Sequence, residues 1–378
     1  MALKGLSTTC LLLHGMKCSW PMKLLTEALL RPMPCRLYSG KLKVAVAGLT
    51  KENKSLVNCL QCMGVDIERA RRRQPGVLKK MITHEQSVAQ FLQSKGAAGE
   101  TVASIISRYP RAITRTYEHL QKKWEIWKSI LKTDSEIIRI VERSPESFFR
   151  SSNTTNLEEN IKFLSSLGLT PSDLCRLLSR APRTFSNRSE LNRQMVELLQ
   201  DVYFSLGGDR PEEFVKQVLS KNVFLLIRST KRVKANIEFL QTGLGLKDKD
   251  LLALLQGHGA DILDLSHEYI KRNFASAKQK LQSLGCTDSE VTSFFISYPP
   301  VLYLSPKNFI DKIDYLLRAK IDIKQVLEKP RVMDVSVATI ISRVKELEKI
   351  DYSFQACGIG ILDLSAKRFE AKLNKLTT

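Results

Sequence analysis

Basic side chains recur in this chain at nearly regular places, shortly after the ends of apolar runs that have helical spacing. The residues concerned are Arg111, Arg115, Arg143, Arg150, Arg183, Arg188, Arg228, Lys231, Arg232, Lys271, Arg272, Lys307, Arg331, Lys367 and Arg368. Guanidinium groups stay charged and donate hydrogen bonds in a fixed planar arrangement, which suits them to phosphate groups and to the edges of bases. The residue types and their spacing therefore indicate a site that binds a polyanion.

The composition of the chain agrees with such a partner. The formal net charge is +20 and the isoelectric point is about 9.6. Nucleic acid is the first candidate and an anionic membrane surface the second. A protein that is merely basic ranks below nucleic acid, because the charge recurs in register with the repeat and is not confined to one tail. Apolar residues make up 43% of the sequence, which is enough for a continuous core.

Sequence motifs of enzymes and metal sites do not occur in this chain. There is no G-x-x-x-x-G-K-[ST], G-x-G-x-x-G, H-E-x-x-H or G-x-S-x-G sequence. Cys59 and Cys62 form a C-x-x-C pair, but a structural zinc ion needs four ligands and no second pair or nearby histidine supplies them. We therefore expect no catalytic residue, no metal ion and no cofactor.

A proline-containing stretch, which we call a seam, accompanies most of the basic residues. Seams with proline occupy residues 74–79, 109–113, 143–150, 181–185, 298–302 and 329–333, and copies without proline occupy 222–228, 260–265 and 358–362. The first four prolines lie 35, 35 and 37 residues apart. A fixed period of this length is typical of stacked supersecondary units.

Each repeat is predicted to hold two helices and a short third element. Apolar residues such as Leu157, Ile161 and Leu164 have helical spacing in the first helix, which usually ends at a glycine. The second helix begins with a capping box, as at 133–136, 170–173 and 287–290, and the proline ends it. The few apolar residues after the proline predict a 3₁₀ turn. The expected fold is an all-α solenoid of about eight to nine repeats, forming a superhelix with a basic groove.

Equivalent positions in a solenoid line one face, so bases that keep phase with the repeat would form a positive stripe along it. The alternative is that each arginine caps the last carbonyl groups of its own helix. That explanation is as good as phosphate binding for a single arginine, but it weakens when the pattern returns at eight or nine seams. Trp124 and Trp127, three residues apart, are predicted to be core residues.

The amino-terminal residues have a different composition. Five bases against the single acid Glu27, with many Ser, Thr and Leu residues, are typical of a mitochondrial transit peptide. We predict a transit peptide at residues 1–38, a linker at 39–55 and a helical-repeat DNA-binding domain at 56–378. Removing residues 1–38 leaves a net charge of about +16, so the import segment does not explain the basicity.

Several long stretches carry a family resemblance. Residues 74–77, 105–116, 142–150 and 230–240 resemble the mitochondrial transcription termination factor family, and the likeness covers roughly residues 56–378. It implies a left-handed helical superhelix that binds double-stranded mitochondrial DNA as a monomer, along the major groove, in the matrix nucleoid. The implied site is the terminator in the leucine tRNA gene downstream of the 16S ribosomal RNA gene, where the protein would stop the mitochondrial transcription machinery.

The resemblance also implies roles for particular residues. The DNA-binding residues would be Arg143, Arg150, Arg183, Arg232, Arg331 and Arg368. The bound DNA would be bent and unwound, with everted bases stacked on Arg143, Phe224 and Tyr269. The seam that holds Phe224 lacks its proline, which departs from the pattern.

Without the resemblance, Phe224 and Tyr269 would be interpreted as core residues, because a Phe after a seam usually fills the space beside the turn. Phe149 and Phe185 are predicted to do so. Two other functions stay open at this point. One is an RNA-binding array that acts in mitochondrial ribosome assembly, which is the role that resemblance to other members of the family would imply. The other is a protein-binding scaffold of the HEAT or TPR type, whose groove would be apolar or mixed in charge.

Overall fold

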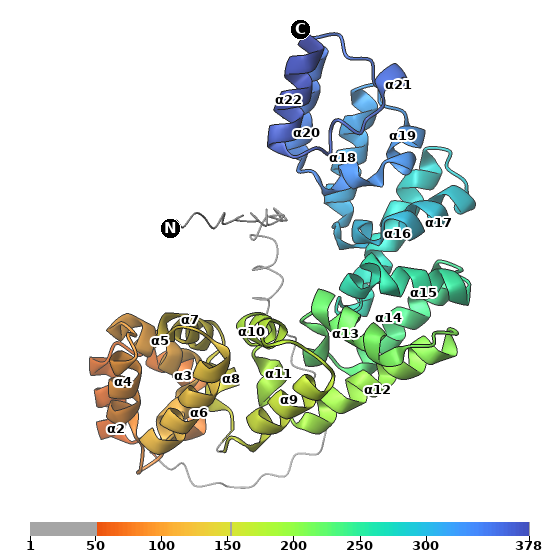
Figure 1. Ribbon diagram of the computed structural model, residues 1–378. Helices are drawn as coiled ribbons and strands as arrows, with labels where there is room; N and C mark the ends of the chain where they lie inside the picture. The colour runs from red at the N-terminus through yellow and green to blue at the C-terminus, as the bar shows by residue number, and fades with distance from the viewer. Residues whose placement is uncertain (1–50, 152, 378) are drawn as a thin grey trace, which may run out of the picture. The chain divides into compact units, whose positions relative to one another are not determined.

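Every regular element in the described part of the chain is a helix. The computed structural model describes residues 51–151 and 153–377, and no strand occurs among them (Figure 1). The predicted transit peptide at residues 1–38 and most of the predicted linker lie outside these residues. No helix within the described residues is long and apolar enough to cross a membrane.

The helices of residues 51–377 that the structure describes form nine successive units, which we number from the amino-terminal end. The first helices of the units are α2 (Lys54–Cys62), α4 (Glu85–Ser94), α6 (Tyr117–Ile130), α9 (Thr155–Ser166), α12 (Ser189–Ser205), α14 (Thr230–Gly243), α16 (His267–Ser283), α18 (Pro306–Arg318) and α20 (Val337–Glu348). The second helices are α3 (Ile67–Arg73), α5 (Gly99–Arg108), α7 (Asp134–Arg143), α10 (Pro171–Arg180), α13 (Pro211–Lys221), α15 (Asp248–Gln256), α17 (Asp288–Ser297), α19 (Ile323–Glu328) and α21 (Phe354–Cys357).

A short third element follows the second helix at each seam. These elements are η1 (Pro75–Val77), η2 (Pro110–Thr114), α8 (Pro145–Phe149), α11 (Arg183–Ser186), η3 (Leu225–Ile227), η4 (His258–Ile262), η5 (Pro299–Tyr303) and η6 (Pro330–Asp334). The ninth unit has turns at residues 359–363 instead, and α22 (Ala366–Thr377) closes the array. The prediction of an all-α solenoid with eight to nine repeats is confirmed.

The third element is not a 3₁₀ turn in every unit. In units 3 and 4 it is a short α-helix, so the prediction was wrong for α8 and α11. The Arg150 and Asn187 N–H groups donate to carbonyl groups four residues back, on Glu146 and Arg183, at 2.9 and 3.0 Å. Glu146 and Arg150 also pair at 3.7 Å with helical i,i+4 spacing, which favours the α form in unit 3.

Successive units pack element by element, which gives three parallel rows. First helices contact first helices, as α12 contacts α14 and α16 contacts α18, and second helices contact second helices, as α5 contacts α7. Third elements also contact one another: η2 with α8, α8 with α11, α11 with η3, η4 with η5, and η5 with η6. We call this last set, from η1 to η6, the third-element row. Residues that keep phase with the seams are therefore placed along one row.

Local signals explain where the helices begin and end. Capping boxes open α7, α10 and α17, as predicted from their sequences. Apart from α6, which ends at the extended residue Leu131, the first helices end at a residue with positive φ, which is usually a glycine such as Gly168 (φ 76°) or Gly245 (φ 62°). In units 8 and 9, Lys320 and Asp351 adopt this left-handed conformation instead, with φ of 58° and 54°.

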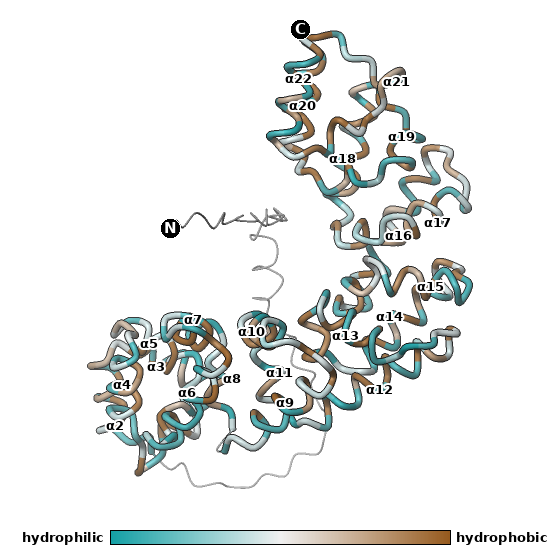
Figure 2. The backbone as a smooth tube through the Cα atoms, in the orientation of Figure 1, coloured by the Kyte–Doolittle hydropathy of each residue, from teal (hydrophilic) through white to brown (hydrophobic). Residues whose placement is uncertain are grey.

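The core is continuous along the array. In Figure 2 most helices carry both apolar and polar residues, as expected for helices with one buried face. Leu157 and Leu164 are buried and Ile161 is half-buried, which agrees with the predicted stripe. Trp124, Trp127, Phe149 and Phe185 are all at most 1% exposed, so the core assignments of these four residues are confirmed.

A buried polar side chain ties each of several first helices to the third element of its own unit. The donors are Asn160, Asn236, Asn273, Lys312 and Arg343, and the acceptors are the carbonyl groups of Phe185, Leu263, Leu302, Met333 and Leu362, respectively. In units 1 and 2 a backbone N–H does the same, from Asn53 to Leu78 and from His84 to Ile113. These bonds hold the third-element row in place, because a buried carbonyl that lacks a donor costs about 1–3 kcal/mol.

Candidate nucleic-acid interface

Most seam bases lie on the third-element row or in the connection and first two turns that follow it, whereas Arg143 lies just before it, at the end of α7. Arg111, Arg150, Arg183 and Arg331 are exposed, and so is Arg188 in the connection after α11. Lys231, Lys271, Arg272, Lys307, Lys367 and Arg368 are exposed in the first two turns of the next helices. The row therefore presents cations from unit 2 to the carboxyl-terminal helix, as the repeat pattern predicts.

Several basic side chains bond to the next unit rather than to their own helix. Arg108, at the end of α5, donates to the carbonyl groups of Glu142 and Arg143 at the end of α7. Arg143 in turn donates to the Ser179 carbonyl near the end of α10. The alternative prediction was that each arginine caps the carbonyl groups of its own helix. Arg108 and Arg143 do cap a helix, but it is the helix of the next unit.

Two more bases repeat this arrangement. The Arg115 guanidinium donates to the carbonyl groups of Phe149 and Arg150 at 2.8 and 3.1 Å, which links η2 to the end of α8. Lys221 donates to the Gln256 and Gly257 carbonyl groups at the end of α15. A carbonyl group is neutral, so these bonds orient the cations without cancelling their charge.

The arginine side chains also repel one another. Burial lowers the pKa of Arg143, and the neighbouring charges of Arg139 and Arg180 lower it further. Burial likewise lowers the pKa of Arg115, and Arg111 adds to the effect. Arginine remains protonated at neutral pH, so the cations are held in place at an electrostatic cost that a bound anion would relieve.

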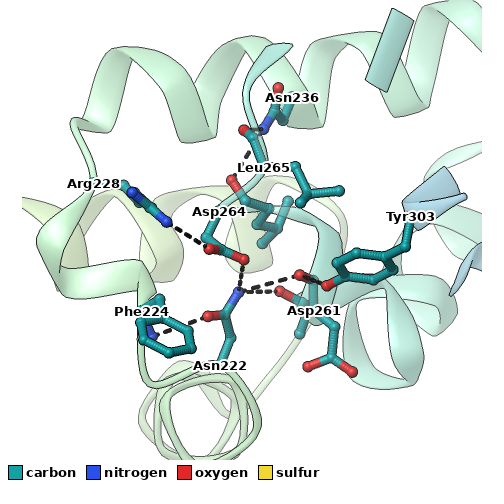
Figure 3. Close-up of polar contacts among 10 residues, drawn as sticks. Asn222, Phe224, Arg228, Asn236, Asp261, Asp264, Leu265 and Tyr303 are labelled. Atoms are coloured by element: carbon teal, nitrogen blue, oxygen red, sulfur yellow. Dashed lines mark hydrogen bonds and ion pairs between the residues drawn. The ribbon is translucent and has the colours of Figure 1, made fainter. Parts of the chain in front are cut away.

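The seam between units 5 and 6 is built differently (Figure 3). Asn222 is buried where most other seams have the residue before proline, and its amide donates to the Ala260 carbonyl at 2.9 Å and to Asp264 Oδ1 at 3.1 Å. Asp264 Oδ2 accepts from Arg228 at 3.0 Å, with both side chains less than a quarter exposed. A carboxylate therefore neutralises the arginine here.

Unit 7 joins the same cluster. The Tyr303 hydroxyl of η5 donates to the Asp261 carbonyl of η4, as Figure 3 shows. Burial raises the pKa of Tyr303, with the Asp264 and Asp261 charges adding to it, so the hydroxyl keeps its proton. The Asn222, Arg228, Asp261, Asp264 and Tyr303 contacts thus connect three successive third elements.

The residues predicted to stack on bases lie in three different units. Arg143 ends α7 in unit 3, Phe224 precedes η3 in unit 5, and Tyr269 lies in the first turn of α16 in unit 7. They form no common pocket. Phe224 is half-buried against the core, and its N–H donates to Asn222 Oδ1 at 3.1 Å. The side-chain amide of Asn222 thereby holds the backbone at a seam that lacks proline.

Tyr269 is half-buried and has two polar neighbours. Its hydroxyl donates to the Tyr303 carbonyl at 2.6 Å, and the Arg272 guanidinium lies 5.4 Å from the centre of its ring. The ring is thus placed beside the third-element row and next to a cation.

The other predicted DNA-binding arginines differ in their burial and in the hydrogen bonds and ion pairs that they form within the protein. Arg150 pairs with Glu146, whereas no hydrogen bond or ion pair within the described residues involves the Arg183 side chain. Arg331 interacts with the Tyr298 hydroxyl, Arg232 is half-buried near Arg228, and Arg368 is exposed on α22.

Sequence reasoning missed Asn222 and Asp264, which the structure places at the centre of the polar cluster. A signal for Asn222 was present, because an asparagine with a short hydrogen-bonding side chain occupies the end of a helix at a seam without proline. Asp264 gave no such signal, since its partners lie on other units. No group of three or more His, Cys, Asp or Glu residues that could hold a metal ion occurs within the part of the chain that the structure describes.

Comparisons with known proteins agree with this architecture. The mTERF family model matches residues 57–370. The chain is 52% identical to "Transcription termination factor 1, mitochondrial" of Homo sapiens, over 97% of this chain and 91% of that protein. It is 49% identical to "Transcription termination factor 1a, mitochondrial" of Mus musculus, over 94% of each. Identity to "Transcription termination factor 2, mitochondrial" of Homo sapiens is 31%, over 93% of this chain and 95% of that protein. The predicted likeness to the founding member of the family, mitochondrial transcription termination factor 1, is confirmed.

Proposed function

Because this chain belongs to the mTERF family, we propose that it is a mitochondrial transcription termination factor that binds double-stranded DNA in a sequence-specific manner. The observation that supports this most strongly is the set of cations at the seams, beside the third-element row, where Arg108, Arg115 and Arg143 bond to neutral carbonyl groups of the next unit and keep their charge. Arg183 adds a cation that has no partner within the described residues. Cations held in such a row suit the repeating phosphates of a duplex.

We propose that the terminator in the leucine tRNA gene, downstream of the 16S ribosomal RNA gene, is the DNA site. A single copy of the chain would bind there in the matrix nucleoid, after removal of residues 1–38, and block the transcription machinery by remaining bound. Residues 56–378 would form the DNA-binding domain. Arg143, Arg150, Arg183, Arg232, Arg331 and Arg368 would contact the duplex.

The spread of the three stacking candidates supports a particular way of binding. Phe224 and Tyr269 are half-buried, so each side chain is partly accessible to a ligand beside the row. We propose that the duplex is bent and unwound and that everted bases stack on Arg143, Phe224 and Tyr269, one base on each. Everting a base costs a few kcal/mol, which stacking on a flat side chain partly offsets.

Competition binding at one stated salt concentration tests this proposal. The competitors are the terminator duplex, a scrambled duplex, each single strand, and folded RNA of the same sequence. We expect the terminator duplex to bind most tightly and to stop transcription in a reconstituted assay. Tighter binding of the folded RNA would instead favour a role in ribosome assembly.

The salt dependence of affinity tests the phosphate contacts separately. If about eight seam bases touch phosphates, the slope of log K against log salt should be about −7. A slope shallower than about −3 would contradict a phosphate-binding row. A variant in which an exposed base at the other end of a second helix is neutralised, such as Lys249→Gln in the first turn of α15, serves as the control and should keep the slope.

A further inference from the structure

The connection between unit 1 and unit 2 differs from the other seam connections. It runs from Leu78 to His84, seven residues, whereas residues 115–116, 187–188 and 228–229 connect the third element to the next helix in units 2, 4 and 5. Met81 and Ile82 lie at its tip and are 84% and 81% exposed. Large apolar side chains that are this exposed are uncommon in the rest of the described chain, where seam residues such as Leu304 and Val335 are half-buried against the core.

Both ends of the connection are fixed. Asn53 holds the first part, because its N–H donates to the Leu78 carbonyl at 2.8 Å and its side-chain amide donates to the Lys80 carbonyl at 2.9 Å. At the other end, the His84 N–H donates to the Ile113 carbonyl of η2 at 2.7 Å. The tip at residues 81–83 is therefore presented from two anchored points and is not a loose segment.

The same anchors place the tip beside the third-element row. The connection leaves η1 and reaches η2, and the Arg111 N–H of η2 donates to the side chain of Gln74, just before η1, at 2.6 Å. The two apolar side chains thus project at the amino-terminal end of the row that carries the seam bases.

The surroundings of the tip are basic. Lys79 and Lys80 precede it directly and are exposed, and Arg72 and Arg73 end the nearby helix α3 and are exposed too. The acids nearby are few: Glu52 and Glu68 both pair with Arg71, and Glu85 begins α4. Exposed apolar side chains beside unpaired cations match a partner with an apolar interior and an anionic surface, and stacked base pairs between phosphate strands have this character.

We propose that Met81 and Ile82 form an apolar wedge that enters between two stacked base pairs at one end of the bound duplex, while Lys79 and Lys80 bind the phosphates on either side. Met and Ile are among the side chains that insert in this way in DNA-bending proteins, and the larger protein surface that a bent duplex can wrap offsets the cost of unstacking one step. This inference rests on the proposed function, because it requires a bound duplex.

A scan with 2-aminopurine tests the wedge. The duplex that the full chain protects most strongly from nuclease is selected from a random library, and the fluorescent base is placed at each position in turn. For the wild-type chain we expect increased fluorescence at one step near the end of the protected site. The double variant Met81→Gln, Ile82→Gln should lose the signal at that step alone, bind about 10- to 100-fold more weakly, and keep the salt slope and melting temperature of the wild type.

Two matched variants separate the contributions. The double variant Lys79→Gln, Lys80→Gln should keep the fluorescence signal and reduce the salt slope by about 2. Phe204→Gln removes an apolar side chain that is 74% exposed on α12, and it should behave like the wild type in both measurements.

Different failures have different meanings. If the wild-type chain protects no duplex, the proposed function and the wedge both fall. If it protects a duplex but shows no terminal unstacking, or if the Met81 and Ile82 variant keeps that signal, the wedge alone is overturned. Unchanged DNA complexes together with weaker binding of the variant to anionic vesicles or to the polymerase would also overturn it, because the tip would then serve another partner.

Discussion

The seams of units 2 to 4 and the seam between units 5 and 6 use the same repeat position in opposite ways. We call η2, α8 and α11 the amino-terminal seams, and η3 with η4 the central seam. In the amino-terminal seams, Arg115, directly after η2, donates to neutral carbonyl groups of the next unit. In the central seam, Arg228 donates to the carboxylate of Asp264.

The difference concerns charge rather than geometry. Both arrangements join one unit to the next, so both stabilise the stacking of the repeats. Only a bond to a neutral carbonyl leaves the full positive charge for an external anion, whereas an internal carboxylate cancels it. We infer that the amino-terminal seams supply more of the affinity for DNA and that the central seam supplies more of the stability around Phe224.

The largest effect is expected from Asn222→Ala in the central seam. The substitution removes the buried amide that donates to Ala260 and Asp264 and accepts from Phe224. Buried groups left without partners cost about 1–3 kcal/mol each, so the free energy of unfolding should fall by about 2–4 kcal/mol. Urea denaturation measures this.

Asn308→Ala in the first turn of α18 is the control for that substitution, since no hydrogen bond of its side chain is found within the described residues. It should change stability by less than about 0.5 kcal/mol. If Asn222→Ala is equally mild, the amide does not hold the central seam and the comparison with the proline seams breaks down.

A smaller effect, which depends on pH, is expected in the amino-terminal units. Lys123 of α6 is 2% exposed and lies 5.7 Å from the centre of the Phe148 ring. Burial, with the Arg115 charge adding to it, lowers its pKa to about 8 from 10.5. Between those two pH values the unfolded chain holds a proton that the folded chain has lost, so stability should rise with pH across this window.

Lys123→Met isolates that contribution, because it keeps the length of the side chain and removes the titration. The wild type should gain about 1–3 kcal/mol relative to the variant between pH 7 and pH 10, measured by urea denaturation at each pH. If the free energy of unfolding changes with pH in the same way for both proteins, burying the protonated Lys123 does not destabilise the folded chain, and the prediction is wrong.

The contrast in charge is tested most directly by Arg183→Ala and Arg228→Ala. Arg183 is exposed and has no partner within the described residues, so its loss should reduce the salt slope of DNA binding by about 1 and the binding free energy by about 1–2 kcal/mol. Arg228 is already neutralised by Asp264, so Arg228→Ala should leave the slope nearly unchanged and should lower stability instead. Equal changes in slope would contradict the distinction between the two kinds of seam.

Most of the fold was accessible from the sequence because its signals are local. A capping box such as Thr133–Glu136, a proline after a helix, and a glycine at the end of another each fix a boundary from neighbouring residues. The α-helical form of α8 was missed because its seam has the same proline and apolar residues as the seams that form 3₁₀ turns. What favours the α-helix there is one additional ion pair, between Glu146 and Arg150.

The candidate site was less accessible, because its decisive contacts join residues far apart in the chain. The sequence shows that Arg143 and Arg228 lie at seams, but it does not show that one meets the Ser179 carbonyl and the other the Asp264 carboxylate. Such partners are 36 residues away, one repeat along the array, and only the stacking of the units brings them together. The sequence predicted that the seam residues are positively charged. It did not predict which of these charges an internal carboxylate neutralises and which stay available to a ligand.

The smallest effect is expected from Tyr269→Phe, which separates two roles of one ring. The hydroxyl donates to the Tyr303 carbonyl at 2.6 Å, and the half-buried ring lies beside the third-element row. Removing the hydroxyl alone should lower stability by about 0.5–1.5 kcal/mol, the usual contribution of one hydrogen bond. Because stacking needs only the flat ring, the variant should terminate transcription as the wild type does.

Tyr269→Ala should lose termination more than it loses binding to random duplex. If Tyr269→Phe abolishes termination while keeping its stability, the hydroxyl contacts DNA directly and the stacking role is wrong. If Tyr269→Ala only lowers the melting temperature and weakens every duplex equally, the ring belongs to the core of unit 7 and has no stacking role.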